Sequence, residues 1–350
     1  MDELDPDRTR VAIVDPLVGT VLDRRYQIEF RLAAGGFGAI YRATHVINHR
    51  AVALKVLHTT LATEPDVVAR FRREAQALGA LKSPHTILAY DFGETRDGTL
   101  YIAMELLQGE SLFERFRALG PISWRRMVAI ARQICSSLAE AHAIGIVHRD
   151  LKPTNIHLEE VAGDPDYVKV LDFGIAKILH GSTLDTGDLT RSGQMIGTFD
   201  YMAPEQMFDG AVTPRSDIYT LGVVLYEMIS GDKPFGDPES AAEMLQRIVT
   251  RTPAPLSSIS DAPPELDAIV ARCLDRDSLE RYASVDELSR ELEAVLGVDD
   301  TKTQLTQIGD DTGTWIDRAP EAVDPRITLP GVAPPDRDTP WPLAGPGRKR

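Results

Sequence analysis

The most restrictive feature of this sequence is a dense group of chemically active side chains near its middle. The run His148–Asn155, with the sequence HRDLKPTN, places a carboxylate, an ammonium and an amide close together. Pro153 prevents this run from forming a continuous helix, so we expect a loop. Asp172 follows as a second carboxylate, in a glycine-terminated turn after a strand predicted over 168–171. One carboxylate can orient a hydroxyl, and the other can hold a hard cation that bridges phosphates.

A glycine-rich segment lies upstream, between two predicted strands. Its glycines allow backbone N–H groups to close over a triphosphate, although a glycine-rich hairpin by itself is as often a simple turn. The segment consists of Leu32, Ala33, Ala34, Gly35, Gly36, Phe37, Gly38, Ala39 and Ile40.

A lysine inside an apolar strand is the next feature. Lys55 lies in the strand predicted over 51–57, and a buried ammonium requires a partner. Glu74, in a predicted amphipathic helix, is the expected partner. In the alternative interpretation the lysine stem extends out of the sheet and Glu74 is an unrelated surface residue.

Hydrophobic periodicity predicts an α+β fold. Strand-like runs at 26–32, 39–41, 51–57, 86–92 and 100–106 surround one amphipathic helix. From Ser123 onward the apolar residues recur at steps of three and four, which predicts a long helix. We therefore expect a small antiparallel sheet with one helix, followed by a larger and mainly helical body.

The two ends of the chain differ from this body in composition. Residues 1–25 are charge-rich and contain Pro6 and Pro16, so they are predicted to be a lead-in, with ordered structure from about Tyr26. Residues 298–350 are rich in proline and threonine and are predicted to be disordered.

Composition excludes several kinds of partner. The chain has 38 Lys and Arg against 53 Asp and Glu, and its formal net charge of −15 disfavours nucleic acid and anionic lipid. No apolar run is long enough for a membrane helix, and the acidic first residues do not resemble a signal peptide. Cys135 and Cys273 form neither a disulfide framework nor a metal motif, so we expect a cytoplasmic protein.

Taken together and in this order, the motifs resemble those of the protein kinase superfamily, in particular the bacterial serine/threonine kinases of the eukaryotic-like type. The resemblance covers about residues 26–297. It implies the two-lobed protein kinase fold, with an N-lobe at about 26–103, a hinge at 104–110 and a C-lobe at 111–297. Beyond the motifs already described, it rests on GTFDYMAPE at 197–205, SDIYTLGVVLYEM at 216–228 and Arg281.

The resemblance also implies catalytic roles. Lys55 would bind the α- and β-phosphates of ATP, Asp150 would orient the substrate hydroxyl, and Lys152 would neutralise the transferred phosphoryl group. Asn155 and Asp172 would hold Mg²⁺, with Mn²⁺ as an alternative metal.

Further implied roles concern the adenine ring and the scaffold. Met104 would be the gatekeeper, Glu105 and Leu107 would offer backbone groups to the base, and Ala53 and His157 would line its site. Glu205 would pair with Arg281 to hold the activation segment, and Asp217 would anchor the catalytic loop from below.

Two residues depart from the family pattern. Ala33 replaces the usual first glycine of the loop, which would stiffen the lid and raise the KM for ATP modestly. His157 occupies a position that is normally apolar. It would either stack on the purine or pack as a neutral core histidine.

Regulation is predicted in two segments. Thr190 and Ser192 are candidate autophosphorylation sites, where a phosphate would bind Arg149; the alternative is that they are ordinary loop hydroxyls. The threonines of the tail are candidates for phosphothreonine-binding partners, or else part of a solvated linker. Homodimerisation through the small lobe is expected by analogy alone.

The overall prediction is a MgATP-dependent serine/threonine protein kinase that acts on protein hydroxyls in signal transduction. A kinase-shaped scaffold would lack equivalents of Lys55, Asp150 or Asp172, and all three are present. Small-molecule phosphotransferases of related fold generally lack the APE-type segment and the lysine at 152. These two rivals are therefore disfavoured.

Overall fold

The computed structural model describes residues 15–35, 38–57, 68, 69, 72, 75, 78–173, 199–207 and 211–309. Several predicted features fall elsewhere in the chain. Outside the described residues lie Gly36, Phe37, Glu74, Thr190, Ser192, Thr198 and the tail from residue 310 onward.

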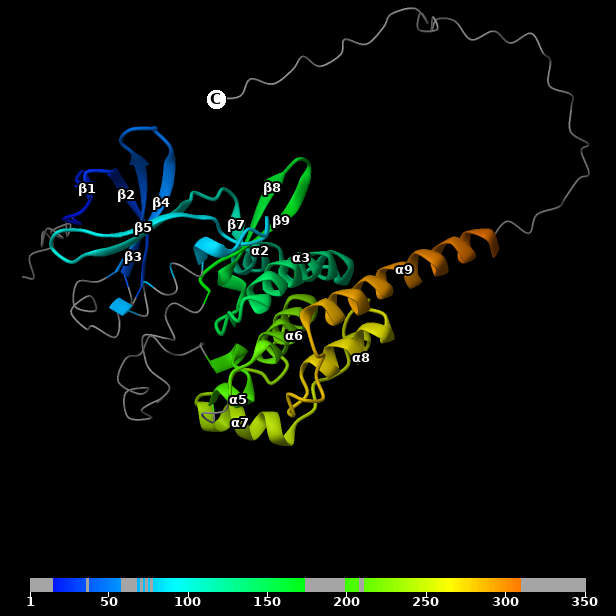
Figure 1. The fold of residues 1–350 in the computed structure, drawn as a ribbon. Helices are drawn as coiled ribbons and strands as arrows, with labels where there is room; N and C mark the ends of the chain where they lie inside the picture. The colour runs from blue at the N-terminus through cyan, green and yellow to red at the C-terminus, as the bar shows by residue number, and fades with distance from the viewer. Residues whose placement is uncertain are drawn as a thin grey trace, which may run out of the picture. The chain divides into compact units, whose positions relative to one another are not determined.

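The N-lobe is built on a six-stranded antiparallel sheet with the strand order β1-β2-β3-β4-β6-β5 (Figure 1). Its strands are β1 (Val21–Leu22), β2 (Tyr26–Gly35), β3 (Gly38–His45), β4 (Ala51–Leu57), β5 (Ala89–Glu94) and β6 (Leu100–Glu105). Strand β4 matches the prediction over 51–57. It lies between β3 and β6, where Lys55 pairs in register with Ile40 on one side and Ile102 on the other.

The two faces of this sheet belong to different hydrophobic cores. Ile102 and Leu57 face the main core, which continues into the C-lobe, whereas Ile28 and Tyr41 lie in a second, smaller core. Leu17 packs on that second core. The prediction that ordered structure begins near Tyr26 is therefore wrong: residues 15–25 are part of the N-lobe, and a two-residue strand is too short to produce a periodic signal.

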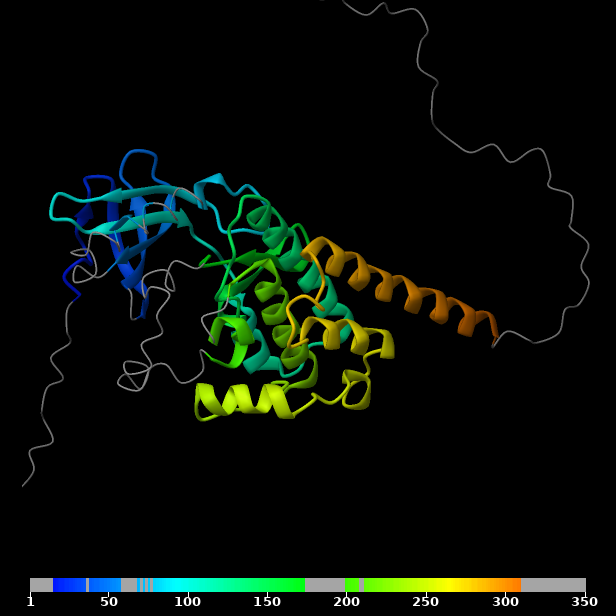
Figure 2. The same ribbon diagram turned by 60° about the horizontal axis from the view of Figure 1, so that its bottom comes forward.

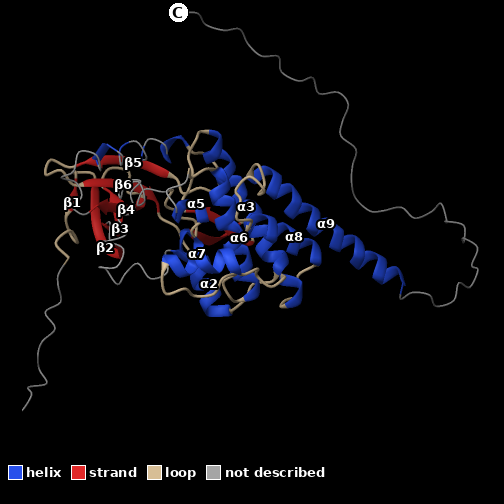
Figure 3. Cartoon of the chain, turned by 90° about the horizontal axis from the view of Figure 1, so that it is seen from below, coloured by secondary structure: helices blue, strands red, loops and turns tan. Residues whose placement is uncertain are grey.

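The C-lobe is mainly helical, and Figures 2 and 3 show its helices gathered apart from the strands of the N-lobe. It also carries a small sheet of β7 (Glu110–Ser111), β8 (Ile156–Val161) and β9 (Asp164–Val170). The helices are α2 (Leu112–Leu119), α3 (Trp124–Ala143), α5 (Pro204–Met207), α6 (Pro214–Ser230), α7 (Ala241–Thr250), α8 (Pro264–Cys273) and α9 (Val285–Gly309). Short 3₁₀ turns occur at Pro153–Asn155, Phe199–Tyr201 and Leu256–Ser258.

Two helices form the centre of this lobe. The apolar stripe predicted for α3 is confirmed, since Met127, Ile134 and Leu138 are fully buried. Helix α6 is buried on nearly every side: every residue from Ser216 to Ile229 is buried, including the polar residues Asp217 and Glu227. Thr213 caps its first turn, and Gly231 ends it with a φ of 93°, a left-handed conformation that glycine adopts readily.

Two predicted element limits are wrong. The strand predicted over 86–92 occurs as β5, three residues later at its start, because Thr86 and Ile87 pair with Val170 of the C-lobe instead. Helix α9 continues to Gly309, past the predicted start of the disordered tail at 298. The first proline of the tail, Pro320, comes only later, so nothing in this stretch prohibits a helix.

Candidate active site

The predicted catalytic loop lies between α3 and β8 and brings its polar groups together. Lys152 Nζ lies 2.9 Å from Asp150 Oδ2. The Asn155 amide nitrogen donates to the backbone carbonyl of Asp150 at 2.8 Å and to Asp150 Oδ2 at 3.2 Å. Because the amide nitrogen is used in this way, the amide oxygen of Asn155 remains for another ligand. Pro153 begins the short 3₁₀ turn that brings Asn155 back toward Asp150.

The second carboxylate lies at the end of β9 and reaches the lysine of the N-lobe. Lys55 Nζ contacts Asp172 Oδ1 at 2.6 Å. The Asp172 backbone has a φ of 52°, an uncommon left-handed conformation for a non-glycine residue. Burial by itself would raise the pKa of this carboxyl, but Lys55 and, less strongly, Lys152 keep its pKa below the usual value. Asp172 is thus held as an anion.

The described partner of Lys55 is therefore Asp172. The predicted partner, Glu74, lies outside the described residues, so the Lys55–Glu74 pair remains a prediction. The ammonium group of Lys55 has three N–H donors. Contact with Asp172 therefore does not prevent the same group from pairing with Glu74.

The anchoring role predicted for Asp217 is confirmed. This carboxylate is 1% exposed and accepts hydrogen bonds from the backbone N–H groups of His148 at 2.8 Å and Arg149 at 2.9 Å. The ring Nε2 of His142 lies 2.7 Å from it. Arg149 has a φ of 65°, so the loop is held in a strained conformation by this carboxylate.

Sequence reasoning missed His142. The residue is a positioning group, because it touches Asp217 and not the catalytic residues themselves. A signal was present: His142 lies four residues after Leu138, on the buried stripe of α3, where a polar side chain requires a partner.

His148 connects the catalytic loop to the turn that carries Asp172. Burial lowers its pKa, and the ring Nε2 lies 2.8 Å from the backbone carbonyl of Leu171. The neutral ring donates from Nε2 to this carbonyl and accepts the Asp150 N–H at Nδ1, 3.3 Å away. The ring also packs against Phe173, with a centroid distance of 4.7 Å.

The glycine-rich hairpin is formed by β2 and β3. A Cβ on Gly38 would lie 2.1 Å from the carbonyl oxygen of Val56, so only glycine fits beside β4 at this position. Among the described residues, a Cβ on Gly35 would meet nothing within 4 Å. Ala33 pairs with Ile40 directly after a register shift in β2, and it lies within the strand as β2 runs to Gly35.

The backbone contacts predicted between the adenine ring and Glu105 and Leu107 stay a prediction. The backbone N–H of Glu105 donates to the Leu88 carbonyl at 2.9 Å and so is already used. Its side chain accepts from Leu88 N and from Lys169 Nζ, both at 2.8 Å. His157 is partly exposed and its Nε2 lies 2.8 Å from the Gln108 carbonyl, so it is not a buried core histidine.

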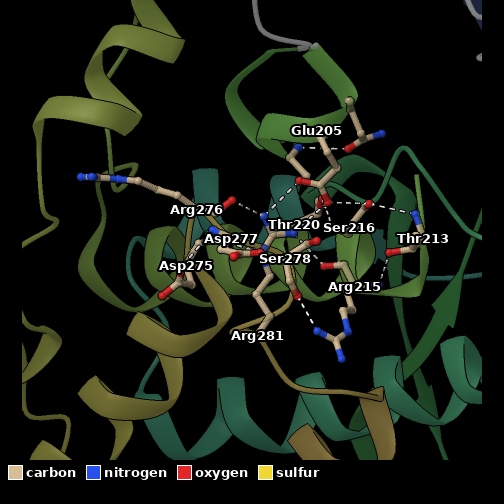
Figure 4. A network of polar contacts seen from close by, with 12 residues as sticks. Glu205, Thr213, Arg215, Ser216, Thr220, Asp275, Arg276, Asp277, Ser278 and Arg281 are labelled. Atoms are coloured by element: carbon tan, nitrogen blue, oxygen red, sulfur yellow. Dashed lines mark hydrogen bonds and ion pairs between the residues drawn. The ribbon is translucent and has the colours of Figure 1, made fainter. Parts of the chain in front are cut away.

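The pair that closes the activation segment is confirmed. Glu205 and Arg281 form two contacts, at 2.8 and 3.0 Å (Figure 4). Burial would raise the pKa of Glu205, but hydrogen bonds from Arg281 and Ser216 keep its pKa below the usual value. The next residue, Gln206, donates to the Arg149 carbonyl at 3.0 Å and thereby ties this segment to the catalytic loop.

A comparison with known families agrees with this geometry. A family model described as the protein kinase domain matches residues 26–291. This chain belongs to the protein kinase family. The kinase is 39% identical over 288 residues to the serine/threonine-protein kinase Pkn3 of Myxococcus xanthus, covering 82% of this chain and 52% of that protein. It therefore spans about half the length of this relative.

Other similar proteins are also bacterial kinases. PknL of Mycobacterium tuberculosis is 36% identical over 282 residues, which cover 80% of this chain and 68% of PknL. PrkC of Bacillus subtilis is 34% identical over 283 residues, covering 81% of this chain and 42% of PrkC. The crystal structure of the Mycobacterium tuberculosis PknI kinase domain superimposes with a TM-score of 0.61 at 25% identity, covering 79% of this kinase and 98% of that chain. The two-lobed kinase fold is thus confirmed.

The residues present in this kinase fit a nucleotide with a divalent cation. The carboxylate of Asp172 and the amide oxygen of Asn155 are hard oxygen ligands of the kind that Mg²⁺ prefers. Lys55 and Lys152 add positive charge beside them. Within the described parts of the kinase, no helix is long and apolar enough to cross a membrane.

Proposed function

We propose that this chain transfers the γ-phosphoryl group of MgATP to serine and threonine hydroxyls of proteins. The observation that carries the proposal is the cluster in which Lys55 contacts Asp172 while Lys152 and Asn155 contact Asp150. The four charged side chains are partly buried, with Lys55 16% and Asp172 41% exposed, so they are accessible to a ligand while they hold one another in place. The cluster matches the requirements of phosphoryl transfer, which is catalysed mainly by positioning and by charge neutralisation.

Each side chain then has one task. Lys55 binds the α- and β-phosphates, and Asn155 and Asp172 hold the magnesium ion. When bound, the ion neutralises the charge of the phosphate oxygens. Asp150 accepts a hydrogen bond from the substrate hydroxyl and orients it, and Lys152 stabilises the charge that develops on the transferred group.

The Lys55–Asp172 ion pair is compatible with this task. Lys55 Nζ contacts Oδ1 of Asp172, at 2.6 Å. The other oxygen of Asp172 would hold the ion, and the remaining donors of the ammonium would bind phosphate oxygens. The pKa of Asp172 is already low, so no proton has to leave before the metal binds.

Protein hydroxyls are the acceptors that the chain supports best. The segment at 197–205 has the family's APE ending, and in the structure Glu205 is anchored to Arg281 and Gln206 to Arg149. This segment gives a peptide substrate a fixed surface beside the catalytic loop. The same argument disfavours a small-molecule phosphotransferase.

The finer parts of the proposal concern regulation. Thr190 and Ser192 are proposed autophosphorylation sites, and a phosphate there would bind Arg149 through charge-assisted hydrogen bonds. Phosphothreonine-binding partners of the tail, a homodimer, and a cytoplasmic location remain proposals of the same kind. Mn²⁺ is proposed as an alternative metal because it accepts the same oxygen ligands.

Incubation with labelled ATP and Mg²⁺ tests the proposal. The wild-type chain should label itself or a generic protein acceptor, whereas Asp150→Asn should lose at least a hundredfold in rate because the hydroxyl is no longer oriented. Phosphosite mapping of residues 182–192 then tests the regulatory part. Label transfer that is unchanged in Asp150→Asn would reject the assignment of Asp150.

A further inference from the structure

The N-terminal segment contacts the glycine-rich hairpin through one carboxylate. Asp15 lies outside the region that the kinase family model matches. Its Oδ2 is 3.1 Å from Arg31 Nη1, and the Tyr41 hydroxyl lies 3.2 Å from Oδ1 and 3.1 Å from Oδ2. The backbone N–H of Leu17 donates to Oδ1 at 3.1 Å. The carboxylate is 12% exposed and Tyr41 is 4% exposed, so their contact is shielded from water, whereas the Arg31 side chain is 51% exposed.

The two residues that Asp15 contacts lie on opposite strands of the hairpin. Arg31 on β2 pairs directly with Tyr41 on β3. The next pair toward the glycine-rich loop is Ala33 with Ile40, so β2 has one additional residue, Leu32, between the two pairs. Such a β-bulge bends a strand and changes the direction of its side chains. Leu32 is the first residue of the segment predicted to cover the nucleotide, and it is 47% exposed.

We propose that Asp15 is a positioning residue for the nucleotide: it clamps both strands of the hairpin at the bulge and so fixes the direction of Leu32 and of the end of β2. The inference rests on the proposed function, because it assigns the hairpin to nucleotide binding. Asp15 does not touch the reacting groups itself and acts through Arg31 and Tyr41.

The clamp is attached to rigid structure at both ends. On the hairpin, the Tyr41 side chain belongs to the second core and is 4% exposed. Burial, followed by the hydrogen bond to Asp15, raises the pKa of Tyr41 to about 12, so its hydroxyl remains a donor at neutral pH. On the N-terminal side, Gly19 N donates to the Ile28 carbonyl and Ile28 N to the Thr20 carbonyl, both at 2.9 Å. The segment that carries Asp15 is therefore itself held to β2 by backbone hydrogen bonds.

Without the Asp15 carboxylate, the hairpin would lose its contacts with the N-terminal segment through Arg31 and Tyr41, which are the only ones described next to the bulge. The sheet pairing of β2 and β3 would remain, because its backbone hydrogen bonds do not involve Asp15. Leu32 and the end of β2 would then sample more orientations, and a nucleotide would have to select the competent one. The apparent affinity for the nucleotide falls in proportion to the fraction of molecules in which the hairpin has the binding-competent orientation. The rate of phosphoryl transfer after the nucleotide has bound is unchanged.

Steady-state kinetics of Asp15→Ala test this inference. We expect the KM for MgATP to rise about three- to tenfold while kcat stays within about twofold of wild type. Asp15→Asn keeps an acceptor for Tyr41 and Leu17 and should rescue most of the effect. Tyr41→Phe, which removes only the hydroxyl, should raise the KM in the same direction, and it replaces Asp15→Ala if that variant does not fold.

The matched control is Glu29→Gln. Glu29 belongs to the same hairpin, where its carboxylate pairs with Arg42 at 2.9 Å and accepts from Thr44 at 2.5 Å, but it has no described contact with the N-terminal segment. Its KM should stay within twofold of wild type. An equal rise in Glu29→Gln, an unchanged KM in both Asp15→Ala and Tyr41→Phe, or a failure of Asp15→Asn to rescue would overturn the inference. A wild-type protein without any phosphoryl transfer would instead reject the proposed function.

Discussion

The Glu205–Arg281 pair tests how much a buried ion pair contributes to the free energy of unfolding. The Arg281 side chain is 0% exposed and that of Glu205 is 15% exposed. All five N–H donors of the guanidinium have acceptors: two contacts go to Glu205, and the others go to the backbone carbonyls of Arg215, Asp275 and Arg276 (Figure 4). Removal of Glu205 would leave a buried positive charge with backbone carbonyls and the Tyr219 ring, 4.8 Å from the guanidinium carbon, but without a carboxylate.

The expected magnitude follows from this burial. Removing one partner of a buried ion pair costs about 3–5 kcal/mol, because the remaining charge is uncompensated. We therefore expect Glu205→Ala to lower the free energy of unfolding by about that amount. The double variant Glu205→Ala, Arg281→Met removes both charges, so it should cost clearly less than the sum of the two single changes.

Urea unfolding, followed by tryptophan fluorescence, measures these differences. Glu293→Ala is the matched control, because Glu293 pairs with Arg132 between α9 and α3 at 2.8 Å but is 62% exposed. Its loss should cost less than about 1 kcal/mol. The reasoning is refuted if Glu205→Ala costs no more than Glu293→Ala, or if the two changes at 205 and 281 are additive.

The same pair has a defined pH dependence. The pKa of Glu205 is lowered in the folded state, so the stability that its charge contributes is present above the ordinary carboxyl pKa and is lost as the pH falls through the folded value. The difference in stability between the wild type and Glu205→Ala should consequently shrink at acid pH. A constant difference from pH 7 to the acid limit of folding would contradict this.

Three further predictions concern separate parts of the fold. Gly38→Ala should weaken nucleotide binding and destabilise the N-lobe, because its Cβ would overlap the Val56 carbonyl; a wild-type KM and melting temperature would contradict this. Burial lowers the pKa of His148, so below about pH 6.5 the unfolded state binds a proton that the folded state does not. The free energy of unfolding should therefore fall with decreasing pH, with a slope of up to about 1.4 kcal/mol per pH unit. The variant His148→Gln should reduce this slope. Cys135 and Cys273 are buried, and burial raises the pKa of Cys135 to about 12, so neither thiol should react with iodoacetamide until the protein is unfolded; rapid native alkylation detected by mass spectrometry would refute this.

The sequence was sufficient for the parts of this protein that local patterns encode. The α3 stripe and strand β4 follow from periodicity, because the spacing of apolar residues determines which face of an element is buried. The side chains proposed for phosphoryl transfer were identified from the order of their motifs along the chain. The Glu205–Arg281 pair and the anchoring role of Asp217 were expected only through resemblance to a known family.

Other parts were decided by tertiary structure alone. Asp172 as the described partner of Lys55, His142 at Asp217 and Asp15 at Tyr41 are contacts between residues far apart in the chain. Periodicity indicates that a polar residue lies on a buried face, but it does not identify the group across the interface. The shifted start of β5 has the same cause, since the backbone groups of Thr86 and Ile87 pair across the lobes. Hydrogen bonds and ion pairs are satisfied by whatever group the fold brings within about 3 Å, and that depends on the packing of whole elements.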